Sequence, residues 1–293
     1  MNIYFADIFC GVINKSEYVY NHNVKELTPF YRYYEKKNYE EVFMKNQVSL
    51  FLDSGAFSAF TKNVEINIDE YIEFIKKHKQ HLDIYANLDV IGNAEGTLKN
   101  QKYMESKGLN PMPCFHYKED NKYLEHYVNN YDYIALGGVA QLKGNKVQLK
   151  YWLDELWEKY LTKDDGTAKL KVHGFGMTNV ELMKRYPWYS VDSTSWVLTG
   201  RFGGVFCDIG DYNKIAISEK GDIKGSAHFY QLGEANQKII REYFANLGGG
   251  YTVEELASDY KKRDEVNILY FLELEKKLSK IPVKFVQQQT SLF

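Results

Sequence analysis

The sequence has little cysteine, no long hydrophobic run and no excess of positive charge. Its three cysteines are Cys10, Cys114 and Cys207. They are too few and too scattered for a disulfide framework, and they lack the CxxC spacing of a zinc site. We therefore expect a cytoplasmic protein with reduced thiols.

Membrane and secretory signals are also missing. No apolar run approaches the roughly 18 residues that span a bilayer. The first residues, Met1–Asp7, contain neither a basic region nor a long apolar region. We expect neither a membrane span nor a signal peptide.

The charge balance bears on partners. The formal net charge is −2, whereas a dedicated nucleic-acid-binding protein usually carries a basic excess. Any contact with phosphates must then come from local patches, such as Lys159–Lys171 or Lys261–Arg263. An ordinary solvated surface explains either lysine group equally well.

What the sequence does contain is an alternation of short apolar runs with helical segments. Continuously apolar strands of this length are typical of a parallel sheet that is covered on both faces. The strands predicted are Ile3–Phe9, Val48–Leu52, Asp83–Leu88, Met112–Tyr117, Tyr133–Leu136, Leu170–Gly174, Tyr189–Asp192 and Gly203–Cys207. The helices between them are predicted at Tyr31–Glu41, Ile68–Lys79, Ala94–Lys107, Tyr123–Asn129, Val147–Leu161 and Thr178–Tyr186. This pattern predicts an α/β fold, a (β/α)8 TIM barrel with a helical C-terminal extension.

The expected organisation is a catalytic barrel over residues 1–210, followed by a hairpin and helices over 211–281 and an extended tail over 282–293. The hairpin is expected around Glu219–Gly221. Helices are expected at Glu234–Leu247 and from the capping pair Thr252 and Glu255 to about Ser279.

Three aspartates lie where predicted strands end. These are Asp53, Asp89 and Asp192. Since the carboxyl ends of barrel strands meet at one rim, we expect the three carboxylates to lie together. Taken singly, each aspartate is equally consistent with a helix cap or an Asx turn.

Carboxylates gathered in this way suit glycosyl transfer. One attacks a sugar C1′, a second carries the proton of the leaving group, and the third accepts hydrogen bonds from a purine-like base. The pair Gly137–Gly138 would let a flat ring approach the backbone closely.

Four segments resemble motifs of the tRNA-guanine transglycosylase family, over about residues 48–204. Asp53–Phe57 is similar to its DSGGFQ segment, Leu136–Ala140 to its LGGLA loop, His173–Gly176 to the strand and turn before its nucleophile, and Val191–Arg201 to its VDCVLPTR segment. Members are (β/α)8 barrels that exchange guanine for a 7-deazaguanine base.

The resemblance implies a role for each matching residue. Asp192 would be the nucleophile, Asp53 the general acid and base, and Asp89 a base-recognising group. Further base-binding candidates are Ser54, Phe57, Gly137, Gly138 and His173. Candidates for contact with nucleic acid are Trp196, by stacking, and Arg201, at a phosphate. For the aromatic residues and His173, packing in the core is the alternative.

The sequence also departs from the family. Ala56 and Ser58 replace a glycine and a glutamine, and the proline of the last motif is missing. The family's C-terminal zinc cluster of three cysteines and a histidine is absent, so we expect no metal and no cofactor. Zinc-free relatives in this superfamily include phage and bacterial enzymes that place 7-deazaguanines such as preQ0 into DNA. DNA is therefore the expected partner, with tRNA as the alternative, together with a free guanine or 7-deazaguanine base.

The tail Gln289–Phe293 resembles the QLSLF-type peptide by which bacterial replication proteins dock into the sliding clamp. An extended peptide with apolar anchors suits a groove; a disordered or packed tail is the alternative. Two other functions stay open: a glycoside hydrolase barrel using the same carboxylates, and a non-catalytic barrel that only holds nucleic acid.

Overall fold

The computed structural model describes residues 1–6, 24–35, 49–142, 145–177, 179–221, 223, 225–280 and 283–286. The chain divides into two compact units. The first unit comprises Met1–Ala6, Lys25–Ser193 and Leu278–Phe293, and the second unit comprises Asp7–Val24 and Thr194–Lys277.

The first unit is built on one curled sheet of eight parallel strands. Their order across the sheet is β4-β3-β2-β1-β8-β7-β6-β5. Strands that follow one another in the sequence are neighbours, β8 pairs with β1, and the sheet is open between β4 and β5. The strands are β1 (Asn2–Ala6), β2 (Lys25–Pro29), β3 (Leu50–Asp53), β4 (Ile84–Tyr85), β5 (Cys114–His116), β6 (Tyr133–Gly137), β7 (Lys171–Gly174) and β8 (Ser190–Ser193).

The sheet forms a half-barrel and is not closed by a continuous ladder. Where β4 and β5 face each other, a single isolated parallel bridge joins Ala86 to Met112. The backbone N–H of Met112 donates to the carbonyl of Tyr85, and the N–H of Asn87 donates to the carbonyl of Met112, both at 2.9 Å. The α/β class is therefore confirmed, and the arrangement is compatible with a TIM-like barrel.

One predicted strand belongs to another sheet, and one strand was missed. Gly203–Cys207 does not complete the parallel sheet, because it lies in a separate sheet of the second unit. The missing strand is β2, in a segment whose sequence, Lys-Glu-Leu-Thr-Pro, has no apolar run. Leu27 alone supplies an apolar side chain to the sheet interior there, while Glu26 and Thr28 are buried as well.

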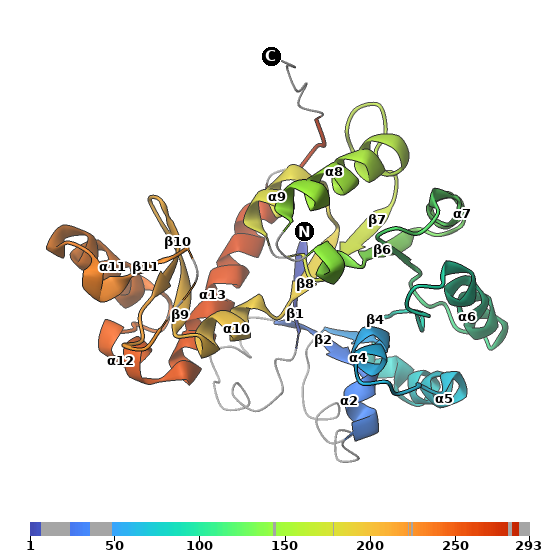
Figure 1. Ribbon diagram of the computed structural model, residues 1–293, viewed down its shortest axis with the longest axis horizontal. Helices are drawn as coiled ribbons and strands as arrows, with labels where there is room; N and C mark the ends of the chain where they lie inside the picture. Colours follow the sequence, from blue (N-terminus) through green and yellow to red (C-terminus); the bar gives the residue numbers. More distant parts are fainter. Residues whose placement is uncertain are drawn as a thin grey trace. The chain divides into compact units, whose positions relative to one another are not determined.

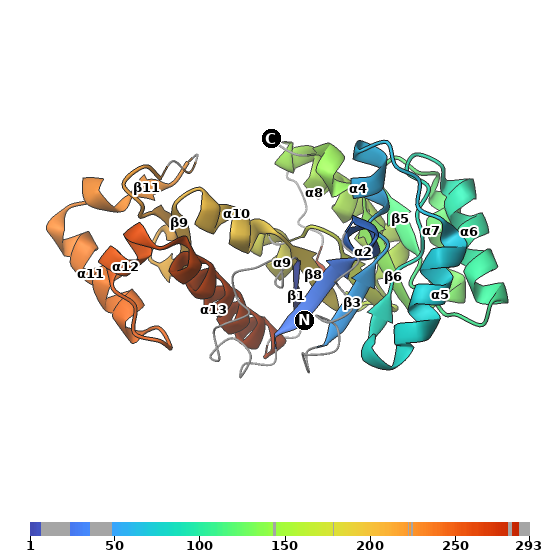
Figure 2. The same ribbon diagram turned by 90° about the horizontal axis from the view of Figure 1, so that it is seen from below.

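Both faces of the sheet are covered. Tyr4, Leu27, Phe51 and Ala135 come from four strands and pack together inside the curl. On the outer face, Leu50 and Leu52 pack against helices that surround the sheet (Figure 2). The helices of this unit are α2 (Phe30–Glu35), α4 (Ala56–Thr61), α5 (Ile68–His78), α6 (Ala94–Ser106), α7 (Asn121–Asn130), α8 (Lys146–Leu156) and α9 (Val180–Arg185).

Side-chain caps mark where α5 to α9 begin. The Asn67 side chain accepts from the N–H groups of Asp69 and Glu70, directly before Ile68, where the helix was predicted to start. The start of α9 differs from expectation, because Asn179 is its cap. Its side chain accepts from the N–H groups of Glu181 and Leu182. Thr178, where the helix was predicted to begin, lies outside the described residues.

The second unit combines a three-stranded sheet with helices (Figure 1). Its strands are β9 (Gly204–Ile209), β10 (Tyr212–Ala216) and β11 (Ala227–His228), and its helices are α10 (Ser195–Arg201), α11 (Glu234–Asn246) and α12 (Val253–Ser258), with most of α13 (Tyr260–Ser279). The antiparallel pair is β9 with β10, turning at Gly210, rather than a hairpin around Glu219–Gly221.

The buried side chain of Asn267 on α13 organises this unit. It accepts from the backbone N–H of Phe206 at 2.7 Å and donates to the carbonyl of Trp196 at 2.9 Å. The capping box of Thr252 and Glu255 is present as predicted, but it opens the short helix α12, and a new helix starts at Tyr260.

Among the described residues, no helix combines the length and apolar character needed to cross a membrane. The tail Gln289–Phe293, Cys10 and Asp7 lie outside the described residues.

Candidate active site

Strand ends bring the three predicted aspartates to the same side of the sheet. Asp53 is the last residue of β3, and Asp192 is the third residue of the four-residue strand β8. Asp89 follows β4 after three residues. Because all eight strands are parallel, these positions share the carboxyl-terminal rim of the half-barrel.

Asp89 and Asp192 both act electrostatically on Asp53. Burial raises the pKa of the Asp53 carboxyl to about 7, and the negative charges of Asp89 and Asp192 raise it further in the same direction. The backbone N–H of Gly55 donates to Asp53 Oδ2 at 3.0 Å and partly offsets this rise. Asp53 is thus a carboxyl group that gains and loses its proton near neutral pH.

Asp192 is held differently. It is 6% exposed, and its Oδ1 accepts from the backbone N–H of Gly176 at 3.0 Å. The same oxygen lies 3.1 Å from Nε2 of His173, which is fully buried. Two donors therefore hold Oδ1 of Asp192 in place, while Oδ2 has no hydrogen-bond partner among the described residues.

A chain of buried hydrogen bonds continues behind His173. Its Nδ1 lies 2.6 Å from Oγ of Ser190, and that hydroxyl lies 2.5 Å from the hydroxyl of Tyr133. With the imidazole proton on Nε2, Tyr133 donates to Ser190, Ser190 donates to His173, and His173 donates to Asp192. The aromatic ring of Phe51 packs on the imidazole at 4.8 Å between centroids and excludes water from it.

Asp89 is part of a second cluster. Its Oδ2 lies 3.2 Å from Nε2 of His116, and Sγ of Cys114 lies 3.5 Å from the same nitrogen. Nδ1 of His116 faces Oε1 of Glu119 at 3.3 Å. Burial lowers the pKa of His116, but Cys114 and Asp89 raise it more, to well above the ordinary value. Asp89, Cys114 and His116 carry the atom types that bind a divalent metal.

The two glycines predicted to bind a base have packing roles. A Cβ on Gly137 would lie 2.8 Å from Cδ2 of His116 and 2.9 Å from Sγ of Cys114. Gly138 has a φ of 77°, and a Cβ there would lie 2.8 Å from the backbone nitrogen of Tyr117. The missing side chain at Gly137 therefore makes room for the second cluster.

Replacing Gly137 by alanine should displace His116 and Cys114, because neither contact distance can be tolerated. We expect a loss of about 1–3 kcal/mol in the free energy of unfolding, measured by urea denaturation. Gly233→Ala is the comparison, since a Cβ at Gly233 meets no atom within 4 Å; because Gly233 is the N-cap of α11, this variant should lose less than about 1 kcal/mol. Equal stability of the two variants would contradict the packing role.

The remaining predicted residues fall in both units. Ser54 is buried beside Asp53, and its Oγ accepts from the N–H of Ala56 at 3.4 Å. Phe57 lies on α4 and is 51% exposed. Trp196 and Arg201 lie on α10 of the second unit, where Trp196 is only 2% exposed and so belongs to the core of that unit.

Sequence reasoning did not find the partners of the aspartates. Ser190 carried a usable signal, because residues two apart on a strand point to the same face, as Ser190 and Asp192 do. The register, in which His173 pairs with Ser190, then brings the imidazole alongside. No local pattern indicated Tyr133 or Glu119.

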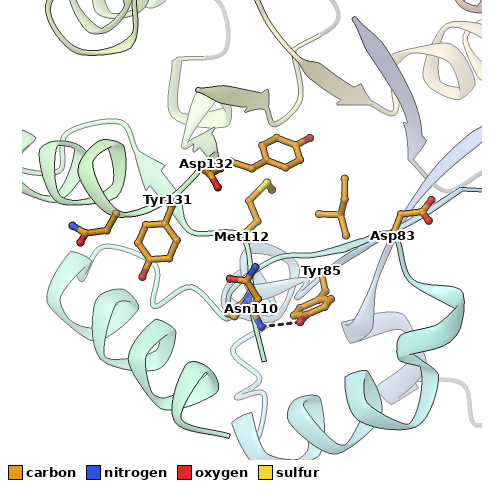
Figure 3. A pocket seen from close by; sticks show the side chains of 10 residues that line it. Asp83, Tyr85, Asn110, Met112, Tyr131 and Asp132 are labelled. Carbon is orange, nitrogen blue, oxygen red and sulfur yellow. Dashed lines mark hydrogen bonds between the residues drawn. The ribbon is translucent and has the colours of Figure 1, made fainter. Parts of the chain in front are cut away.

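A separate cavity lies at the opposite end of the strands (Figure 3). It measures about 270 Å³, and its lining includes Asp83, Asn110 and Asp132, which precede β4, β5 and β6. The Tyr85 hydroxyl accepts from the N–H of Asn110 at 2.8 Å at its edge. Since the carboxylates occupy the carboxyl-terminal rim, this cavity is not the site of their chemistry.

The sequence matches no protein-family model and no curated protein. The chemistry of the rim is accordingly inferred from its own residues.

Proposed function

We propose that the protein is a transglycosylase that exchanges guanine in DNA for a 7-deazaguanine base through a covalent aspartyl-glycosyl intermediate. The observation that carries this proposal is the gathering of Asp53, Asp89 and Asp192 at one rim, with Asp53 near its protonation midpoint at neutral pH. The motif resemblance to the tRNA-guanine transglycosylase family supports it. The finer fold prediction, a (β/α)8 TIM barrel, belongs to the same proposal.

Asp192 is the proposed nucleophile. Its Oδ1 is committed to Gly176 and His173, and Oδ2 attacks C1′ of the target nucleotide. The bond from C1′ to N9 of guanine breaks, and its electron pair leaves with the base. An ester between Asp192 and the sugar results, which conserves the chain of the nucleic acid while the base is exchanged.

Asp53 is the proposed proton carrier. Its protonated carboxyl gives a proton to the departing guanine and becomes a carboxylate. The incoming base then loses its N9 proton to Asp53 and attacks C1′, which breaks the ester and restores Asp192. A pKa of about 7 suits a group that must both donate and accept within one cycle.

Asp89 is proposed to accept hydrogen bonds from N–H groups of the base. Beside the rim, α4 exposes two aromatic side chains, Phe57 at 51% and Phe60 at 61%. Residues three apart lie on one face of a helix, so the pair forms a small stacking surface directly after Asp53. Aromatic side chains of this kind stack on bases that have left a duplex.

DNA is proposed over tRNA because these 293 residues lack the cysteine cluster of the tRNA enzymes and because Gln289–Phe293 resembles a clamp-binding peptide. The test is incorporation of radiolabelled guanine into duplex DNA, single-stranded DNA and bulk tRNA at low salt, where phosphate contacts are strongest. Label in DNA supports the proposal. Label in tRNA alone would mean that the substrate is tRNA rather than DNA. Label in none of the three would contradict the transglycosylase assignment.

Ser190→Ala tests the hydrogen bonds behind Asp192. The change leaves the Tyr133 hydroxyl and Nδ1 of His173 without their partner, so we expect a loss of about 1–3 kcal/mol in stability. We also expect kcat for base exchange to fall while KM stays similar, because Ser190 positions Asp192 through His173 without touching substrate.

The double variant Ser190→Ala with Tyr133→Phe separates these effects. Removing both hydroxyls should restore part of the stability, since no hydroxyl is then left unpaired. The low kcat should persist. A double variant as unstable as the sum of the single variants would argue against the hydrogen-bonded chain.

A further inference from the structure

The cluster of Asp89, Cys114 and His116 has more than one explanation. Ligand atoms from these side chains lie within 4.8 Å of one another. They come from the two strands that flank the opening of the half-barrel, since Asp89 follows β4 and the other two residues lie on β5. Cys114 is fully buried. An ion pair between His116 and a carboxylate would not explain why a thiol lies beside them.

The distances fit a tetrahedral metal site. With zinc bonds of about 2.0–2.1 Å to nitrogen and oxygen and about 2.3 Å to sulfur, the edge of a tetrahedron is about 3.3 Å between N and O and about 3.5 Å between N and S. The observed distances from Nε2 of His116 are 3.2 Å to Asp89 Oδ2 and 3.5 Å to Cys114 Sγ. Two of the three distances between the ligand atoms therefore match a tetrahedral site, and the third, between Asp89 and Cys114, is within 4.8 Å.

The surroundings of the cluster also resemble a metal site. Glu119 faces Nδ1 of His116 at 3.3 Å and accepts from the His116 backbone N–H at 2.9 Å, which aims Nε2 at the other two ligands. A carboxylate behind a ligating histidine is the usual outer partner of a bound metal. Asp89 Oδ1 is buried and has no hydrogen-bond partner among the described residues.

We propose that Asp89, Cys114 and His116 bind one thiophilic divalent cation of the Zn²⁺ class, with Glu119 orienting the histidine. The cation takes the place of the thiol proton and of any proton on Nε2, and these protons are released to solvent. One carboxylate, one thiolate and one neutral imidazole balance the charge of the cation, which suits a buried site. Three protein ligands leave a fourth position open.

Binding would join the two edges of the half-barrel, which one isolated bridge connects in the structure. A ligand that binds only the folded state raises the unfolding temperature. If the proposed function also holds, the cation and the base would share Asp89, whose Oδ2 faces His116 and whose Oδ1 has no hydrogen-bond partner among the described residues. The metal proposal itself is tested without nucleic acid, so either proposal can fail alone.

The test uses Co²⁺ as a spectroscopic stand-in for Zn²⁺. The full chain is freed of metal by a chelator, dialysed and titrated with Co²⁺ under reducing conditions. We expect one equivalent to produce a thiolate-to-cobalt charge-transfer band, with Zn²⁺ displacing it and raising the unfolding temperature. Glu119→Gln should weaken Co²⁺ affinity by about 10–100-fold while keeping the band.

Cys114→Ser should abolish the band. The matched control is Cys207→Ser, which removes a buried thiol of the second unit and should leave the band unchanged. If Cys114→Ser fails to fold, His116→Gln serves instead, with circular dichroism confirming the fold. Absence of a band at one equivalent in the wild-type protein, or a band that survives in folded Cys114→Ser, overturns the proposal.

Discussion

Replacing Asp192 by asparagine is expected to abolish base exchange. The substitution keeps the size of the side chain and a carbonyl oxygen that can accept from Gly176 and His173. It removes the anionic oxygen that forms the bond to C1′, and loss of a nucleophile of this kind typically lowers kcat by about 10⁴-fold or more. The measurement is incorporation of radiolabelled guanine under saturating nucleic acid.

The matched control is Asp83→Asn, which also changes an aspartate next to a strand of the same sheet. Asp83 precedes β4 at the opposite end of the strands and bonds to Ser49. It should retain wild-type exchange. Comparable activity of Asp192→Asn and Asp83→Asn would remove Asp192 from the mechanism.

Replacing Asp53 by asparagine is expected to produce the second large effect. The variant can neither give a proton to the leaving base nor take one from the incoming base, so exchange should fall by about 10²–10⁴-fold. In the wild-type protein, kcat/KM should fall about tenfold per pH unit above pH 7, because Asp53 then loses the proton needed for the first half of the cycle.

The raised pKa of Asp53 should also affect the pH dependence of the free energy of unfolding, which is measured without catalysis. Its folded pKa of about 7 exceeds the ordinary value of 3.8 because of burial and the charges of Asp89 and Asp192. The folded protein therefore binds this proton more tightly than the unfolded chain. The contribution of Asp53 to stability is complete below about pH 4 and is lost as the pH rises through about 7.

Asp53→Asn should consequently be more stable than the wild-type protein at pH 8, by on the order of 4 kcal/mol, and nearly equal to it at pH 4. Denaturant titrations at the two pH values measure the difference. A variant that is less stable at pH 8, or equally changed at both pH values, would mean that Asp53 is ionised without cost and is unsuited to carry a proton.

The placement of the aspartates followed from sequence because it depends on short-range signals. Apolar runs that end in Asp53 and Asp192 indicate buried parallel strands, and parallel strands place their ends at one rim. The enzymatic roles of these residues stay predictions. The starts of α5, α6 and α11 were accessible for the same reason, whereas the short helices α4 and α10 and the start of α13 were not predicted. At α9, adjacent Thr178 and Asn179 both resemble caps.

Other features depend on contacts between distant residues. Strand β2 has no apolar run, because its place is fixed by its neighbours β1 and β3 rather than by its own composition. The cluster of Asp89, Cys114 and His116 joins residues about 25 positions apart in the sequence, a spacing that no CxxC-type motif describes. The expectation of no metal came from such motifs.

The roles of Gly137 and Ser190 could not be predicted for a related reason. The sequence gives their residue types but does not indicate which side chains lie beside them in the fold. Gly137 matters because the side chains of His116 and Cys114 occupy the space of its missing Cβ. Ser190 matters because the strand register places it between His173 and Tyr133. Each depends on pairing between strands that lie far apart in sequence.

The most direct test of the central claim is to locate the covalent intermediate. Wild-type protein is mixed with a guanine-containing DNA duplex in the absence of a free base, quenched in acid, and digested with nuclease and trypsin. Mass spectrometry then searches for a peptide that carries a deoxyribose adduct. Trypsin separates the two key carboxylates, because Tyr186–Arg201 contains Asp192 and Asn46–Lys62 contains Asp53 as the single acidic residue of each peptide. We predict the adduct on Tyr186–Arg201; an adduct on Asn46–Lys62, or exchange without any adduct, would contradict the account.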